Sequence, residues 1–426
     1  MRTSTCSRHG CWSLLLGLSL VATPASCKST DNRAGRVAAN GSGDLGHPPA
    51  ERIAPELAGK TACGAGNLTD AGARLIRRRP YLQRVTATSA VIVWTSLGLA
   101  PGEVALHKVS GAPVSVAPAA LDQTARLPGG ARQWTASLAK LDPNTTYCYE
   151  IREGGAQVVD QSPLTTAPAP GTGARVRMVV IGDSGDGGSD QKAVSKQLDT
   201  VPFDLMLHTG DVAYENGTLD DFESKFFTVY RSYLRRAPVF PASGNHDYQT
   251  ANAEPYRQVF VLPENGAPEG RERWYSYDWG DIHLVALDTE KISPVQAAWL
   301  DADLGSNHLP WVIVYGHKPP YSSGQHGGDV LFQELFVPVL EKHHVPLVLA
   351  GHDHDYERFL PQNGTTYVVT GGGGRGVRAM GRSPMTAYAE PVLHLLLITV
   401  ENDTLSLHAI DGAGREFDGA VIHRGS

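Results

Sequence analysis

The sequence that decides the fold is Val176-Arg177-Met178-Val179-Val180-Ile181-Gly182-Asp183-Ser184-Gly185, an apolar, β-branched run that ends in a polar loop. Such a run predicts a buried strand, and the glycine marks its end. The same arrangement recurs four times further along the chain, where other short apolar runs also end in polar motifs. These runs cover residues 203–208, 238–241, 311–315 and 345–349.

Helical stretches separate these predicted strands. They cover about residues 189–198, 219–236, 294–304 and 329–344. An alternation of strands and helices indicates an α/β domain, in which helices cover both faces of a largely parallel sheet. Ligands of such domains bind at the carboxyl ends of the strands. All five polar motifs stand at such ends, so we expect their side chains to converge on one site.

The region before this alternation has a different pattern. Stretches around residues 91–95, 134–138 and 147–151 are strand-like, with turn residues between them. Several short strands without a helical period predict a small β-sandwich. The chain has 426 residues, more than the roughly 250–300 at which a single core stops growing. We therefore predict two folded domains, residues 75–168 and 174–415, with a linker between them.

The N-terminus has the features of an export signal over residues 1–26. Arg2 and Arg8 accompany an apolar run at 12–22 that is too short to span a bilayer comfortably. Cys27 stands where bacterial lipoproteins carry their lipid, although Pro24 is unusual in such signals. Ordinary cleavage and a membrane lipid anchor at Cys27 both stay open, and either predicts a secreted or cell-envelope protein. Residues 27–74 lack apolar periodicity and are predicted to form a flexible tether.

The composition argues against some partners. The formal net charge of −7 does not fit nucleic acid or an anionic membrane as the main partner, because both select basic surfaces. The basic run Arg77-Arg78-Arg79 is interpreted as a solvated segment. Cys63 and Cys148 either form a disulfide in an oxidising compartment or are unrelated thiols.

The polar motifs carry side chains that bind metals. Carboxylate, imidazole, phenol and amide groups together suit ions such as iron, zinc and manganese. A carboxylate that bridges two ions would hold them roughly 3.5–4 Å apart, lower the pKa of a bound water and neutralise phosphate oxygens. Alone, Gly-Asp after a strand is commonly a turn, Gly-Asn-His-Asp fits a turn or a site equally, and Gly-His-Asp-His favours metal binding. All five motifs in order at strand ends indicate a site. The candidates are Asp183, Asp211, Tyr214, Asn245, His246, His317, His352 and His354.

These loops resemble the metallophosphoesterase superfamily and, within it, the purple acid phosphatases. A tyrosine at the end of the second block separates that family from most other metallophosphoesterases. The five blocks stand here as Gly182-Asp183-Ser184-Gly185, Gly210-Asp211-Val212-Ala213-Tyr214, Gly244-Asn245-His246-Asp247, Val314-Tyr315-Gly316-His317 and Gly351-His352-Asp353-His354. The resemblance implies an αββα-type domain, with central sheets flanked by helices.

The predicted sandwich resembles the fibronectin type III-like domain that precedes the catalytic domain in large members of this family. The resemblance rests on Pro80-Tyr81-Leu82-Gln83, on residues 86–89, and on the turn and strand at 141–149. Taken with the five blocks, the resemblance to this family covers residues 76–415.

The resemblance also implies a role for each ligand. A ferric ion would be held by Asp183, Asp211, Tyr214 and His354. Asp211 would bridge to a divalent zinc, iron or manganese ion, whose other ligands would be Asn245, His317 and His352. His246 would contact the substrate and assist the leaving group. His326 falls where the family places a second such histidine, and the alternative is a solvated loop residue.

The function implied is an acid phosphatase, in which a metal-bound hydroxide hydrolyses small phosphate monoesters. A phosphodiesterase or nucleotide hydrolase on the same metal site is the first alternative, and a non-catalytic binding protein is the second. Two further residues stay open. Arg375 could face the substrate from the glycine-rich loop at 371–374, and Asp288 is interpreted as a structural turn residue.

Overall fold

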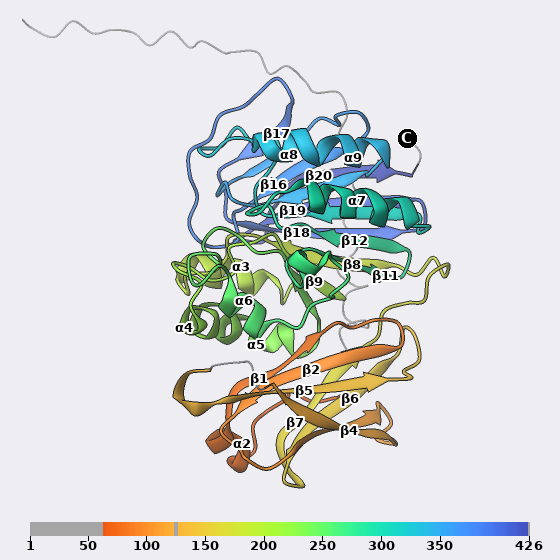
Figure 1. Cartoon of the computed structure of the whole chain (residues 1–426), viewed down its shortest axis with the longest axis vertical. Coiled ribbons are helices and arrows are strands. Elements are labelled where there is room, and N and C mark those ends of the chain that lie inside the picture. Colours follow the sequence, from red (N-terminus) through yellow and green to blue (C-terminus); the bar gives the residue numbers. More distant parts are fainter. Residues whose placement is uncertain (1–62, 123–126, 425–426) are drawn as a thin grey trace, which may run out of the picture. The chain divides into compact units, whose positions relative to one another are not determined.

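The computed structural model describes residues 63–122 and 127–424 (Figure 1). The predicted signal, Cys27 and most of the predicted tether lie outside these residues. Within the described ranges, no helix is both long enough and apolar enough to cross a membrane.

The region before the α/β alternation is a β-sandwich, as predicted. Strand β4 joins its two sheets, because residues 113–118 pair with β3 and residues 119–122 pair with β5. Trp94 and Tyr149 are fully buried in the core of this region. The strands are β1 Ile76–Gln83, β2 Ser89–Ser96, β3 Gly102–Lys108, β4 Pro113–Asp122, β5 Arg132–Ala139, β6 Thr146–Glu153 and β7 Ala156–Thr165.

The predicted tether is too long at its C-terminal end. Residues 70–75 form helix α2 (Asp70–Leu75), and the side chain of Thr69 caps it by accepting a hydrogen bond from the Gly72 amide. A disulfide joins Cys63 to Cys148 on β6. The disulfide is the first of the two alternatives that the sequence left open for these cysteines, whereas a six-residue helix is too short to show a period in a sequence. The last part of the predicted tether therefore belongs to the sandwich.

The α/β region contains two sheets, as the αββα prediction requires. Among the described residues, the first has the order β10-β9-β8-β18-β19-β20 and the second has the order β11-β12-β13-β14-β16-β15-β17. The first consists of β8 Val176–Ile181, β9 Leu205–His208, β10 Val239–Pro241, β18 His394–Glu401, β19 Thr404–Asp411 and β20 Glu416–His423. The second consists of β11 Tyr275–Trp279, β12 Ile282–Ala286, β13 Trp311–Tyr315, β14 Leu347–Ala350, β15 Tyr356–Phe359, β16 Thr366–Thr370 and β17 Thr386–Glu390.

The predicted end of this domain at residue 415 is too early. Strand β20 begins at Glu416 and pairs with β19 along its length. Its sequence contains Asp418 and Gly419 and has little apolar alternation, so it lacks the usual signal of a strand. The backbone hydrogen bonds of β19 nevertheless extend the sheet to His423.

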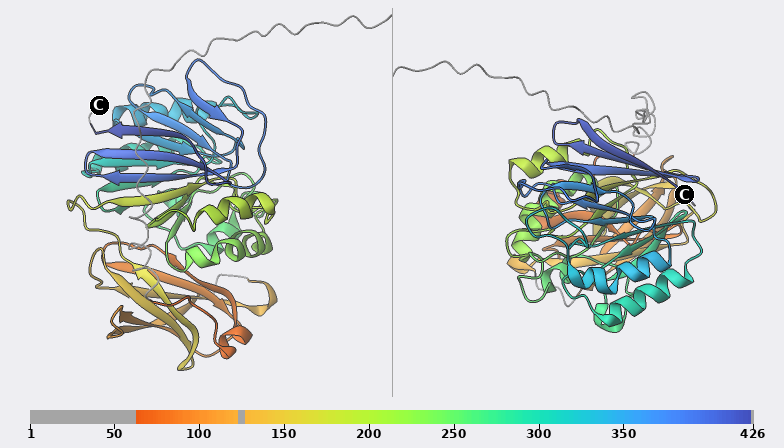
Figure 2. Two further views of the ribbon diagram at one scale, coloured as in Figure 1. Left: turned by 180° about the vertical axis from the view of Figure 1, so that it is seen from behind. Right: turned by 90° about the horizontal axis from the view of Figure 1, so that it is seen from above.

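The second sheet is buried on both faces. On β13, Ile313 and Tyr315 face one hydrophobic cluster, and Val314 faces another that includes Leu300 and Phe332 from the covering helices. Figure 2 shows α7, α8 and α9 on one side of the second sheet, and the blue strands β19 and β20 of the first sheet on the other. Burial on both faces explains why β13 is apolar throughout instead of alternating.

The four predicted helices lie close to their expected positions, but two are interrupted, and α6 (Glu254–Val259) was not predicted. The predicted helix at 219–236 consists of α4, a π-helical segment at Phe222–Phe227, and α5. The predicted helix at 329–344 is split into α8 and α9, and Pro338 stands in the first turn of α9, where its missing N–H is tolerated. The α-helices of this domain in the described part of the chain are α3 Ser189–Gln197, α4 Leu219–Asp221, α5 Thr228–Leu234, α6 Glu254–Val259, α7 Pro294–Ser306, α8 Val330–Leu335 and α9 Val337–Lys342.

One histidine links β11, β12 and α7. His283 on β12 binds Asp278 through Nδ1 at 2.8 Å and Asp303 through Nε2 at 2.9 Å. Burial alone would lower its pKa, but the two carboxylates outweigh burial and raise the pKa of His283 to about 9. The charged imidazole therefore stabilises the folded state up to neutral pH.

We predict a loss of stability in alkaline solution that depends on His283. The contribution of a group with a raised pKa is complete below the unfolded value of about 6.5 and is lost as the pH rises through about 9. Since Asp278 is half exposed, we expect a loss of about 1–2 kcal/mol between pH 6 and pH 10. Melting temperatures of wild type and His283→Gln across this range test it, because the variant should show a smaller fall. Parallel curves would contradict this role of His283.

Candidate metal centre

The five polar motifs follow five strands of the two sheets. Asp183 comes after β8, Asp211 after β9 and Asn245 after β10 in the first sheet. His317 comes after β13, and His352 and His354 follow β14 in the second. Within each sheet these strands are parallel, so their carboxyl ends share an edge. Contacts between side chains of the two sheets show that the two edges meet.

One group of donor atoms surrounds the phenol of Tyr214. Its hydroxyl oxygen lies 3.0 Å from Asp183 Oδ1 and 3.1 Å from His354 Nε2. His354 Nε2 lies 3.5 Å from the same carboxylate oxygen. All three side chains are buried. They are ligands that the family resemblance assigns to one ion.

A second group surrounds the imidazole of His317. Its Nε2 lies 3.1 Å from Asn245 Oδ1, 3.2 Å from His352 Nδ1 and 3.4 Å from Asp211 Oδ2. One ligand atom from each of Asp183, Asp211 and His317 lies within 4.8 Å of the others. The two groups thus meet at Asp183 and Asp211, and the structure brings together all seven ligand candidates.

Glycines precede the ligands because there is no room for a side chain. A Cβ on Gly210 would lie 2.6 Å from His317 Nδ1, and one on Gly351 would lie 2.3 Å from Asp183 Oδ2. The backbone also turns sharply here, with a φ of 55° at Asp183, 53° at Asp211 and 72° at His352. L-residues rarely adopt such angles, which persist only where the surrounding structure determines them.

The electrostatics of this cluster favour a cation. Burial raises the pKa of Asp183 well above its ordinary value, and Asp211 adds to this rise while His317 opposes it. Burial alone would lower the pKa of His317, but the charges of Asp211 and Asp183 raise it to about 10. Positive charge is thus strongly stabilised between the two carboxylates. A metal ion would supply that charge with the donor atoms already in place.

The other two imidazoles keep their lone pairs available in acid. Burial, more than any other factor, lowers the pKa of His352 to about 2 and that of His354 to about 3. Both rings are therefore neutral at mildly acidic pH, and a neutral ring is what a metal ion needs. The donor set fits two ions of the iron, zinc or manganese type.

Two further histidines flank the ligands. His246 packs against Tyr214, with 4.3 Å between ring centroids, and its Nδ1 lies 2.6 Å from the carbonyl oxygen of Glu215. His326 stacks on His352 with 4.2 Å between centroids. His326 is exposed, as expected for a solvated loop residue, but its ring also contacts the cluster through His352.

Sequence reasoning gave no role to two residues that the site uses. Asp247 accepts hydrogen bonds from the amides of Val212, Ala213 and Gly244, and so joins the loops after β9 and β10. Burial and the charge of Asp211 raise its pKa to about 7. The place of Asp247 in the third block could have indicated its importance.

Arg378 is the second such residue. Nothing in the sequence points to it, because it lies 52 residues from its partner His326.

The two residues that the sequence left open lie beside the site in different ways. Arg375 binds the carboxylate of Glu215, and its guanidinium lies 5.2 Å from the centre of the Tyr214 ring. Asp288 accepts hydrogen bonds from the amides of Glu290 and Lys291, as a turn residue does.

The comparisons with known proteins point to the same group of phosphoesterases. Residues 176–356 match the calcineurin-like phosphoesterase family. Acid phosphatase type 7 of Mus musculus is 30% identical over 53% of this chain and 56% of its own length. "Probable inactive purple acid phosphatase 1" of Arabidopsis thaliana is 27% identical over 57% of this chain and 49% of its own. The matches thus span about half the length of these relatives.

A solved structure shows the same fold. It is a purple acid phosphatase from yellow lupin seeds, with a TM-score of 0.71 and 21% sequence identity, and the match covers 81% of this chain and 74% of that one. The calcineurin-like phosphoesterase fold implies a dinuclear metal site, and the buried carboxylate and imidazole cluster lies where such a site is expected.

We predict that Gly210→Ala lowers metal content without unfolding the protein. The new methyl group would displace His317, so we expect at least a tenfold loss of metal affinity. Metal per chain, measured by mass spectrometry after dialysis, tests this. Gly364→Ala is the matched control, because Gly364 has a φ of 91°, close to the 94° of Gly210, but nothing within 4 Å of the added atom. Equal metal loss in both variants would contradict the steric explanation.

Proposed function

We propose that this chain, which carries a calcineurin-like phosphoesterase domain and resembles purple acid phosphatases, hydrolyses small phosphate monoesters. The observation that carries the proposal is the meeting of two donor groups at Asp183 and Asp211, with His246 and His326 beside them. We assign one ferric ion to the group around Tyr214 and a divalent zinc, iron or manganese ion to the group around His317. When bound, the two ions supply Lewis acidity and a water of lowered pKa.

His246 is the residue that we assign to proton transfer. Its Nδ1 lies against a backbone carbonyl, which only accepts hydrogen bonds, so Nδ1 carries the hydrogen. Its Nε2 lies 3.9 Å from Asp211 Oδ2, on the side of the ligands. In the protonated ring, Nε2 can donate to the oxygen of the departing alcohol.

Arg378 and His326 support a preference for monoesters. Arg378 Nη1 lies 2.5 Å from His326 Nε2. Arg378 forms no ion pair within the described ranges, but its charge acts on the buried carboxyl of Asp355 and opposes the rise in the pKa of that group. A phosphate monoester gains its second negative charge near pH 6, whereas a diester carries one. A cation beside the centre therefore favours the monoester at pH values above about 6.

A secreted or cell-envelope location is part of the proposal. The Cys63–Cys148 disulfide supports it, because such bonds persist in oxidising compartments. The neutral state of His352 and His354 in acid supports activity at acidic pH.

Substrate class is the direct test of the proposed function. We expect kcat/KM for 4-nitrophenyl phosphate to exceed that for bis(4-nitrophenyl) phosphate by at least tenfold, with protein purified in its natural metal state. We expect His246→Ala to lower kcat by about 10²- to 10⁴-fold without changing metal content. A higher rate on the diester would favour the phosphodiesterase alternative. Activity on neither substrate would favour the binding protein.

A second test concerns Arg378. We expect Arg378→Gln to raise KM for the monoester about tenfold, since a hydrogen bond to a charged group is lost, and to affect the diester less. Arg382→Gln is the matched control, because Arg382 lies in the same loop but donates to the carbonyl of Ala389. Equal effects of Arg378→Gln on both substrates would contradict this assignment.

Tyr214 provides a spectroscopic test of the ferric site. Phenolate bound to Fe(III) should give a broad visible absorption band, and Tyr214→Phe should remove that band while one iron per chain remains. A visible spectrum with metal analysis on the same sample checks this. A colourless wild type holding two zinc or manganese ions would contradict the ferric assignment.

A further inference from the structure

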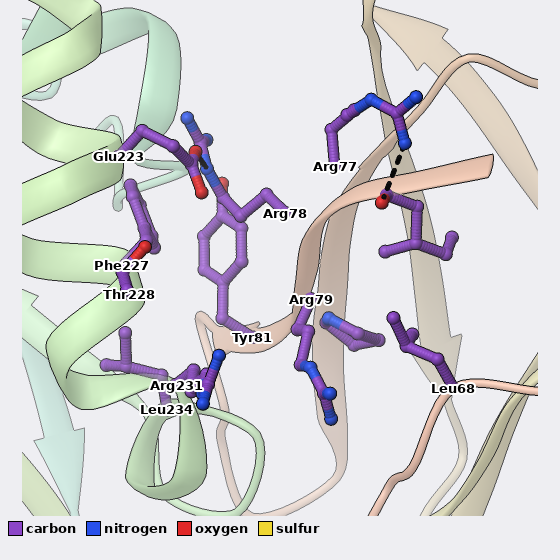
Figure 3. Close-up of a pocket in the computed structure, with 12 residues that line it drawn as sticks. Leu68, Arg77, Arg78, Arg79, Tyr81, Glu223, Phe227, Thr228, Arg231 and Leu234 are labelled. Atoms are coloured by element: carbon purple, nitrogen blue, oxygen red, sulfur yellow. Dashed lines mark hydrogen bonds and ion pairs between the residues drawn. The ribbon is translucent and has the colours of Figure 1, made fainter. Parts of the chain in front are cut away.

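A second charged cavity lies away from the metal centre, between β1 of the sandwich and the helical segment of residues 222–234 (Figure 3). Its volume is about 200 Å³, and Arg77, Arg78, Arg79 and Arg231 contribute to its lining. Glu223 is the acidic residue among its lining residues in the described part of the chain. We call this cavity the arginine pocket.

The arginine pocket corrects the interpretation of residues 77–79 as a solvated segment. Arg78 is 3% exposed, and its Nε donates to the Glu223 carboxylate at 2.8 Å. Its guanidinium also lies 3.9 Å from the centre of the Phe227 ring. Arg78 is thus held in place and neutralised by the helical segment. The three arginines differ in burial along the strand, since Arg78 is buried, whereas Arg77 is exposed and Arg79 is half-buried.

Arg79 and Arg231 have no such compensation. Across residues 63–122 and 127–424, neither has a carboxylate within 4.0 Å. Arg79 donates to the carbonyl of Gly66 at 3.1 Å. Burial lowers the pKa of Arg79, and the charges of Arg231 and Arg235 lower it further. Figure 3 shows Arg79 and Arg231 at the same end of the pocket, while Arg78 and Glu223 lie at the other.

We propose that the arginine pocket binds a small multivalent oxyanion, inorganic phosphate or sulfate, between Arg79 and Arg231. Guanidinium groups bind such anions through paired, charge-assisted hydrogen bonds. The cluster of positive charge stands out in a chain with a formal net charge of −7. A cavity of about 200 Å³ admits an oxyanion with a few waters, but not a polymer. The bound anion would join β1 to α5, and so the sandwich to the phosphoesterase domain.

The proposal does not rest on the proposed catalytic function, but the test must separate two sites for the same anion. Phosphate would also fit the metal centre, so binding to wild type alone does not show which site holds the anion.

Arg231 is exposed, and its substitution should not unfold the protein. Arg77 is the matched control, because it lines the same pocket but its Nη1 donates to the carbonyls of Arg74 and Ile76.

The experiment measures the melting temperature of the full chain in chloride buffer of constant ionic strength, with and without 20 mM phosphate or sulfate. We expect a rise of about 3 °C in wild type, Arg77→Gln and the metal-centre variant His317→Ala, and a rise below about 1 °C in Arg231→Gln and Arg79→Gln. No rise in wild type, or an undiminished rise in Arg231→Gln, would overturn the proposal. Loss of the rise in His317→Ala alone would assign the anion to the metal centre and overturn it as well.

Discussion

The structure depends on the burial of two carboxylates, Asp183 and Asp211, beside one another. Charged groups without compensation are expensive in a protein interior. Here the compensation comes from His317, whose raised pKa shows how strongly the cluster stabilises a positive charge. Metal ions would take over that role with more charge and with more donor atoms satisfied. The buried charges of the cluster therefore fit a cation site that is enclosed by these loops.

The scaffold supplies the rigidity that this arrangement needs. Three ligand residues adopt left-handed backbone angles, which persist only where the surroundings determine them. The strands before the loops are buried, and Asp247 joins two of the loops through backbone amides. The sandwich also contributes, because Gln83 at the end of β1 donates to the carbonyl of Val239 on β10 and accepts from the amide of Val261. This contact braces the strand that leads to Asn245.

Much of the fold and the convergence of the candidate ligands could be predicted from the sequence, because the signals are local. Each candidate ligand stands in the loop after an apolar strand run, so Asp183 and His317 can be found in short windows of sequence. Residues that act through distant partners were not visible in this way. Arg378, for example, meets His326 only in the folded chain. Arg78 was assigned to solvent because three adjacent arginines look alike in a sequence, although the middle one is buried.

Anomalous X-ray diffraction above and below the iron absorption edge, on crystals of protein purified without added metal, would test the central claim most directly. The account predicts two ion peaks within reach of Asp211. One should be an iron among Asp183, Tyr214 and His354, and the other should lie among Asn245, His317 and His352. The absence of ions from both groups, or a single ion bound elsewhere, would contradict it.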